Sequence, residues 1–244
     1  MIDLKSCCAD AYASPLARML LGDSFHPGSA ELTSRLVGAL RVGAGDTVVD
    51  VASGAGTSAI QLARETGCDV LGVDLSAKSV AIAAHAAEVA GFGDRVRFVQ
   101  GDAEALPVAD ASVDGVLCEC SFCLFPDKRT AAGELARVLR PGARLALSDM
   151  TADRDRLPAE LEGAAAWVAC VGAATPLDEL TAELERAGLA VEATERHDDA
   201  LADLIERIGA RLRILGLRPE IVAAARRAVD EGALGYAAVI ARRP

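Results

Sequence analysis

The sequence predicts an α/β fold in which helices cover both faces of a parallel β-sheet. Short apolar runs begin at residues 47, 70, 96, 113 and 144 and alternate with longer amphipathic segments, which is typical of a parallel sheet built from βαβ units. The first run leads into an acid and a glycine turn, Asp50-Val51-Ala52-Ser53-Gly54-Ala55-Gly56, and the second ends in Gly72-Val73-Asp74. Together they have the pattern of a nucleotide-binding βαβ unit.

The individual elements follow from apolar runs, glycines and prolines along the chain. We predict helical structure from residue 3 to about residue 40, interrupted by a loop at 22–28. The predicted strands are 47–51, 70–73, 96–99, 113–118, 144–148, 189–194 and 235–241. The predicted helices are 57–66, 79–90, 128–139, 177–187, 198–215 and 220–231, of which three end at Gly67, Gly91 and Gly188 and one at the exit turn Arg140-Pro141-Gly142.

The glycine turn predicts a ligand with an adenosine end. Glycines have no side chain, so the backbone amides of this turn can approach a ligand closely. Asp74 can accept hydrogen bonds from both hydroxyls of a ribose. The turn also fits the dinucleotide pattern, but Asp50 separates the two cofactor classes, because a carboxylate at a strand end can hold a cationic amine and repels a pyrophosphate. We therefore expect S-adenosylmethionine rather than NAD.

Five motifs resemble, in order and spacing, those of class I S-adenosylmethionine-dependent methyltransferases: Asp50 to Gly56, Gly72-Val73-Asp74-Leu75-Ser76, Gly101-Asp102-Ala103-Glu104-Ala105-Leu106-Pro107, Asp114-Gly115-Val116-Leu117 and Leu139-Arg140-Pro141-Gly142. The resemblance implies a Rossmann-like sheet with an antiparallel C-terminal strand, and a helical insert, 198–231, that starts at the carboxyl edge over the site. It also implies the cofactor-binding positions Asp50, Ala52, Gly54, Gly56, Asp74, Leu75, Asp102, Ala103 and Cys118. Ala52 departs from the pattern, because many members have glycine there.

The composition fits one domain with elaborations. A chain of 244 residues that is 52% hydrophobic can bury one substantial core. We divide the single methyltransferase domain, 1–244, into an N-terminal helical lid at 1–40, a cofactor-binding core at 41–150 and a substrate-side half at 151–244. The net charge of −11 opposes binding to phosphate backbones or anionic lipid. The expected partner is a small molecule or a metalloid, with no nucleic acid and no membrane.

The seven cysteines are expected to be thiols of a cytoplasmic protein. The sequence shows neither a signal-peptide region nor a membrane span, and a reducing compartment keeps thiols unpaired. Cys118, Cys120 and Cys123 surround the end of a predicted strand, where ligands bind in open α/β sheets. Strand alternation places Cys118 and Cys120 on one face and Glu119 on the other. Each cysteine can equally be a core residue, and no paired zinc spacing is present, so no metal is expected.

The segment Trp167-Val168-Ala169-Cys170-Val171-Gly172-Ala173 resembles part of the arsenite methyltransferases, which have a metalloid-binding cysteine at the position of Cys170. Soft thiolates suit trivalent arsenic. No cysteine follows Cys170, so Cys7, Cys8 or a member of the strand-end group such as Cys120 has to complete the thiolate set. The alternative is that Cys170 is a buried helix residue.

Three alternatives to arsenite methylation stay open. The first is methylation of an oxygen, nitrogen or carbon of a small organic molecule, with His26, on the loop expected to fold over the cofactor, or Glu119 as the base. The second is a non-catalytic thiol protein that sequesters a metalloid. The third, a nicotinamide-dependent oxidoreductase, is disfavoured by Asp50. The sequence chooses neither the methyl acceptor nor the oligomeric state.

Overall fold

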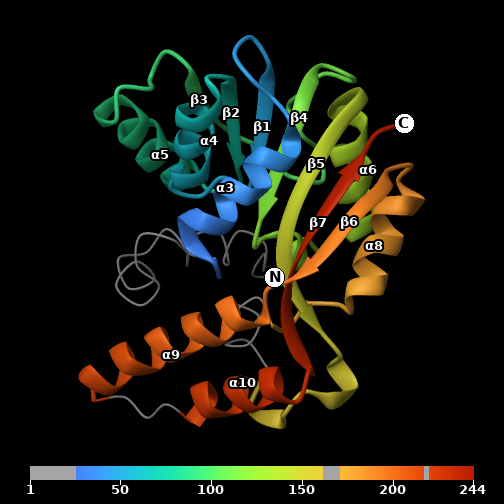
Figure 1. The fold of residues 1–244 in the computed structure, drawn as a ribbon. Coiled ribbons are helices and arrows are strands. Elements are labelled where there is room, and N and C mark those ends of the chain that lie inside the picture. Colours follow the sequence, from blue (N-terminus) through green and yellow to red (C-terminus); the bar gives the residue numbers. More distant parts are fainter. Residues whose placement is uncertain (1–25, 162–170, 217–219) are drawn as a thin grey trace, which may run out of the picture.

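The structure is a computed structural model that describes residues 26–161, 171–216 and 220–244 (Figure 1). These residues form a seven-stranded sheet with the order β3-β2-β1-β4-β5-β7-β6. Its strands are β1 (Thr47–Val51), β2 (Asp69–Asp74), β3 (Val96–Gln100), β4 (Val113–Glu119), β5 (Leu139–Ala152), β6 (Ala190–Arg196) and β7 (Leu234–Arg242). Strands β1 to β5 are parallel, whereas β7 lies antiparallel between β5 and β6. The predicted fold class and the antiparallel C-terminal strand are confirmed.

Helices cover both faces of the sheet and bury two separate apolar cores (Figure 1). The first face, here called the α3 face, is covered by α3 (Ser29–Leu40), α4 (Thr57–Thr66), α5 (Ala77–Val89), α9 (Asp198–Ile214) and α10 (Glu220–Asp230). The opposite face, here called the α6 face, is covered by α6 (Lys128–Val138) and α8 (Leu177–Arg186). Short 3-10 turns are η1 (Phe122–Leu124), η2 (Arg154–Arg156) and η3 (Ala159–Leu161).

The strand order reverses between β1 and β4, and this reversal positions the site. The strands β2 and β3 lie on one side of β1, whereas β4 and β5 lie on the other. Loops leaving the carboxyl ends of β1 and β4 therefore diverge, and ligands bind in the crevice between such loops. Side chains alternate along a strand, so Asp50 and Glu119 share the α3 face with Val48 and Leu117, two residues before each.

Strand β5 is much longer than predicted, whereas the other predicted strands closely match the observed ones. Residues 144–148 were expected, but β5 extends over Leu139–Ala152, so the expected exit turn at 140–142 lies inside the strand. The amide of Gly142 donates to the carbonyl of Arg243 (2.8 Å), and β7 pairs with β5 from Arg144 to Ala152. Pairing with a distant antiparallel partner thus extends β5 beyond the local apolar run.

Candidate active site

The turn after β1 combines one glycine required for packing with another that faces open space. A Cβ on Gly56 would lie 2.6 Å from Phe98 Cζ, so a side chain there would clash with the residue that packs under the turn. A Cβ on Gly54 would meet no atom within 4 Å. Ala52 adopts a φ of 59°, a left-handed conformation that costs an L-residue about 1 kcal/mol and that glycine adopts without this cost. The turn leaves an open side at Gly54, as a cofactor cradle requires.

Asp74 joins two turns at the carboxyl edge of the sheet. Its Oδ2 accepts a hydrogen bond from the amide of Gly54 (2.8 Å), and its Oδ1 accepts one from the amide of Ser76 (2.9 Å). Ser76 in turn caps α5. Burial raises the pKa of Asp74, while the two amides lower it again. Because a carboxylate has about four acceptor sites, these bonds leave capacity for ribose hydroxyls.

Asp50 is a buried carboxylate in need of a cationic partner. It is 3% exposed, and among the described residues its Oδ2 has no hydrogen-bond partner. Burial raises the pKa of Asp50 well above its usual range, and the neighbouring carboxylates of Glu119 and Asp74 raise it further. Such an atom is costly to bury unless a ligand satisfies it. With the open turn at Gly54 and the acid at Asp74, this arrangement fits S-adenosylmethionine.

The loop after β3 carries Asp102 and Ala103, two of the predicted cofactor-binding residues. Asp102 Oδ1 accepts a hydrogen bond from the amide of Glu104 (2.9 Å), and Ala103 is buried. The Asp102 side chain therefore stabilises the turn in which it lies. Leu75, another predicted cofactor-binding residue, is half-buried, and its carbonyl accepts a hydrogen bond from Gln100 Nε2 (3.0 Å).

His26 and Glu119, the two bases predicted for an organic acceptor, come together on the α3 face. His26 Nε2 lies 3.8 Å from Glu119 Oε1, and the side chains are 10% and 4% exposed. The Thr33 hydroxyl donates to Glu119 Oε1 (3.1 Å) and lies 3.4 Å from His26 Nε2. Glu119 is also close enough to Asp50 to raise its pKa. The pair therefore lies beside the predicted cofactor cradle.

The prediction that Cys118 and Cys120 share a face is wrong. Cys118 is fully buried in the core of the α6 face, where its Sγ lies 3.3 Å from Ser121 Oγ and burial raises its pKa. Cys120 and Cys123 pack against the core of the α3 face. Cys120 has a φ of 51°, and this left-handed residue ends the strand alternation on which the prediction depended. The thiol of Cys118 is therefore a core group in this structure, and its predicted contact with the cofactor stays a prediction.

A polar band across three strands was not predicted from the sequence. Tyr236 is fully buried on β7, with its hydroxyl 2.9 Å from Ser148 Oγ. Ser148 is the register partner of Glu119 on β4. Burial raises the pKa of Tyr236, and the neighbouring charges of Cys120 and Glu119 raise it further. Polar residues at core-facing positions of predicted strands are the signal that identifies Ser148 and Tyr236. Thr33 has no such local signal, because only the packing of α3 on the sheet brings it to Glu119.

The predicted arsenic-binding residues Cys7, Cys8 and Cys170 lie outside the described residues. Within the described ranges, no group of three or more histidine, cysteine, aspartate or glutamate residues is arranged to hold a metal ion. The same parts of the chain contain no helix that is long and apolar enough to cross a membrane.

The chain is similar to known proteins of one type. Residues 43–188 match a family model described as a methyltransferase domain. The 27-O-demethylrifamycin SV methyltransferase of Amycolatopsis mediterranei (strain S699) is 39% identical over 202 residues, which cover 76% of this chain and 73% of that enzyme. An arsenite methyltransferase of Aquipseudomonas alcaligenes is 39% identical over 173 residues, which cover 65% of this chain and 49% of the relative, about half its length.

Solved structures share the fold. Geranyl diphosphate methyltransferase in complex with SAM superposes with a TM-score of 0.75 and 22% sequence identity, over 88% of this chain and 85% of that one. The common architecture places the carboxyl edge of this sheet, with Asp50, Gly54 and Asp74, where an open α/β sheet binds its ligand.

Proposed function

Because the chain belongs to the class I S-adenosylmethionine-dependent methyltransferases, we propose that it transfers the methyl group to a hydroxyl oxygen of a small organic acceptor. The buried pair of His26 and Glu119, with Nε2 and Oε1 3.8 Å apart, carries this proposal. A hydroxyl loses a proton during methyl transfer, so a base beside the cofactor cradle serves it directly. The name of the 39% identical rifamycin relative, which specifies an oxygen, supports the same acceptor class.

The residues at the carboxyl edge would divide the binding of the cofactor. The carboxylate of Asp50 would hold the ammonium group, that of Asp74 the ribose hydroxyls, and the loop with Asp102 and Ala103 the adenine. The open side of the turn at Gly54 admits the ligand close to the backbone. Bound S-adenosylmethionine supplies a sulfonium methyl group that is already activated for displacement, so positioning and exclusion of water contribute most of the rate.

His26 has one nitrogen suited to act as a base. Its Nδ1 lies 3.1 Å from the carbonyl of Pro27, and a proton donated to that carbonyl leaves the lone pair on Nε2, which faces Thr33 and Glu119. When Nε2 takes the proton from the acceptor hydroxyl, the imidazolium that forms is stabilised by Glu119. The Thr33 hydroxyl, which donates to Glu119, keeps that carboxylate in place.

Methylation of thiolate-bound trivalent arsenic is the second candidate function. The arsenite methyltransferase relative and the sequence around Cys170 favour it. In that reaction the lone pair on arsenic is the nucleophile, and Cys170 with Cys7, Cys8 or Cys120 would hold the metalloid. No base is then required, so His26 distinguishes the two candidates.

A panel of acceptors tests the proposed function. The full chain is incubated with S-adenosylmethionine labelled in the methyl group and with phenols, secondary alcohols, amines of the same carbon skeletons, or arsenite with glutathione. We expect label in the hydroxyl compounds and none in the matched amines. Labelled arsenic species without labelled organic products would replace the proposal by the second candidate.

A further inference from the structure

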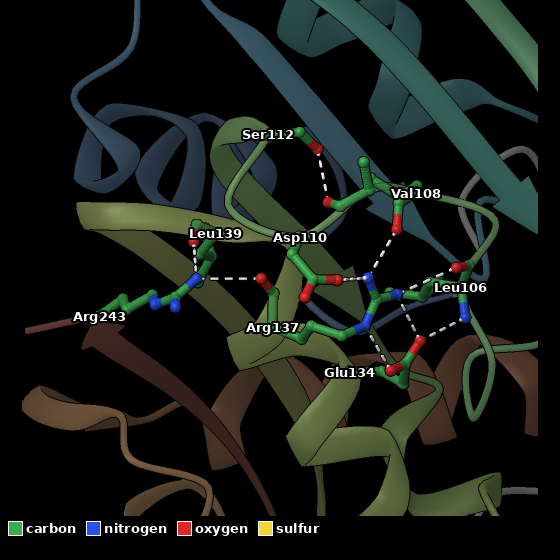
Figure 2. A network of polar contacts seen from close by, with 9 residues as sticks. Leu106, Val108, Asp110, Ser112, Glu134, Arg137, Leu139 and Arg243 are labelled. Atoms are coloured by element: carbon green, nitrogen blue, oxygen red, sulfur yellow. Dashed lines mark hydrogen bonds and ion pairs between the residues drawn. The ribbon is translucent and has the colours of Figure 1, made fainter.

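The loop after β3, residues 101–112, is fastened to the C-terminal half of α6 (Figure 2). The Arg137 guanidinium donates to the carbonyls of Leu106 (3.1 Å) and Val108 (2.8 Å). Glu134 accepts a hydrogen bond from the amide of Leu106 (2.7 Å) and another from Arg137 Nε (2.7 Å). The bond from Arg137 lowers the pKa of Glu134, so both groups stay charged. One ion pair therefore binds both donor and acceptor groups of the loop backbone.

The turn after β4, residues 120–125, is fastened to the other end of α6. Lys128 Nζ donates to the carbonyls of Cys123 (2.9 Å) and Phe125 (3.3 Å). From the opposite side, the amide of Cys123 donates to the fully buried carboxylate of Asp149 (2.7 Å). Lys128 is half-buried, and this burial lowers the pKa of its ammonium group. The turn is thus held between a cation and an anion.

Both segments belong to the site. The loop begins with Asp102 and Ala103, on the cofactor side, and the turn directly follows Glu119, on the acceptor side. We propose that α6 positions the two sides independently, Arg137 acting on the cofactor-side loop (101–112) and Lys128 on the acceptor-side turn (120–125). Both are positioning residues, because each acts through backbone groups of another segment. The role of Arg137 requires only that the chain binds S-adenosylmethionine. The role of Lys128 also rests on the proposed function, because it concerns the acceptor.

The contacts of the two cations do not overlap. Arg137 has its partners on the loop and at Glu134, with the carbonyl of Arg137 itself accepting from Arg243 (3.0 Å) (Figure 2). Lys128 has its partners on the turn. Between the sides, the amide of Asp127 donates to Glu104 (3.0 Å), and the charge of Glu104 also raises the pKa of Lys128. Apolar residues of the loop and the turn, Ala103, Leu106, Phe122 and Phe125, pack in the same core. Replacing one cation therefore removes backbone hydrogen bonds from one segment only, and the proposal expects this difference to outweigh the shared packing.

Substitutions to glutamine test the proposal, with Arg140→Gln as the matched control. Arg140 follows α6 closely, and its guanidinium forms an ion pair with Asp114, outside both segments. We expect Arg137→Gln to weaken binding of S-adenosylhomocysteine about tenfold, as expected for loss of charge-assisted hydrogen bonds, and to speed hydrogen exchange in peptides from 102–112 only. Lys128→Gln should speed exchange in peptides from 119–126 only, and raise the KM of a methylated acceptor about tenfold with unchanged cofactor affinity.

The test depends on which segment exchanges faster in each variant. If either substitution speeds hydrogen exchange in both segments, α6 stabilises the whole region rather than each segment separately. If exchange is no faster than in Arg140→Gln, the two segments are stable without these cations. Either result overturns the proposal. Glu134→Gln replaces Arg137→Gln if the latter does not fold. Hydrogen exchange needs no acceptor, so a wrong acceptor class would leave the exchange pattern intact and change only the KM result.

Discussion

The carboxylate of Asp74 accepts the amide hydrogen of Gly54, with Oδ2 and the nitrogen 2.8 Å apart. An acid at the end of β2 thereby fixes the turn that follows β1. The residue predicted to hold the ribose also shapes the backbone beside it, so cofactor affinity and turn geometry depend on one side chain.

Asp74→Ala should weaken S-adenosylmethionine binding at least tenfold, because a charged bidentate contact contributes about 1.5–3 kcal/mol. It should also lower the midpoint of thermal unfolding without cofactor, since the amides of Gly54 and Ser76 lose their acceptor. Calorimetry and thermal unfolding measure the two effects. Asp74→Asn, which keeps one acceptor oxygen, should show a smaller loss in both, and equal affinity in all three proteins would contradict the assignment.

The two glycines of the turn should respond differently to alanine. Gly56→Ala places a methyl group 2.6 Å from Phe98 and should cost about 1–3 kcal/mol of unfolding free energy through overpacking, in addition to strain at a φ of 80°. Gly54→Ala meets no protein atom, so it should cost about 1 kcal/mol in strain but weaken cofactor binding, because its methyl group fills the cradle. Urea unfolding and calorimetry on both variants check this order.

Local patterns predict the glycine turn after β1 and the acid after β2, whereas distant packing determines the other contacts of the candidate site. Gly54, Gly56 and Asp74 lie at spacings fixed within one βαβ unit, so a short stretch of sequence specifies their arrangement. Cys120 left its predicted face because one left-handed residue ended the strand alternation, which side-chain patterning does not reveal. The meeting of Thr33 with Glu119 depends on how α3 crosses the sheet. Such contacts join segments far apart in the chain, where periodicity carries no information.

Asp50→Asn should stabilise the cofactor-free protein at neutral pH while abolishing tight cofactor binding. Burial raises the pKa of Asp50 above the usual 3.8, so the folded protein retains a proton that the unfolded chain has lost. The stability from this proton is fully present below pH 3.8 and is lost as the pH rises through the folded pKa. Wild type should therefore lose stability relative to Asp50→Asn as the pH rises, which urea unfolding at a series of pH values measures. A difference independent of pH would show that Asp50 is not the titrating group.

His26→Gln should lower kcat for a hydroxyl acceptor by about 10²–10⁴, the usual contribution of a general base, with cofactor affinity unchanged. Glu119→Gln should have a smaller effect, because it removes the partner of the imidazolium and leaves the base in place. Thr33→Val removes the hydroxyl contacts with Glu119, His26 and the carbonyl of Ser29 but keeps the base, so it separates positioning of the pair from proton transfer. Rates at saturating cofactor over a range of pH measure these effects, and a fully active His26→Gln protein would exclude His26 as the base.

The two candidate acceptors give opposite expectations for Cys170→Ser. Under the proposed function no thiol takes part in the reaction, so this variant should methylate hydroxyl acceptors at the wild-type rate. If arsenite is the acceptor instead, Cys170→Ser should lose arsenic methylation while cofactor affinity stays almost unchanged, because thiolates bind trivalent arsenic and a hydroxyl replaces them poorly. Cys68→Ser is the control, since Cys68 is a fully buried core thiol on the turn before β2. Assays of both acceptors with wild type and the two variants then separate an effect specific to Cys170 from the effect of losing any cysteine. A Cys170→Ser protein that is inactive on hydroxyl acceptors would contradict a reaction without thiols.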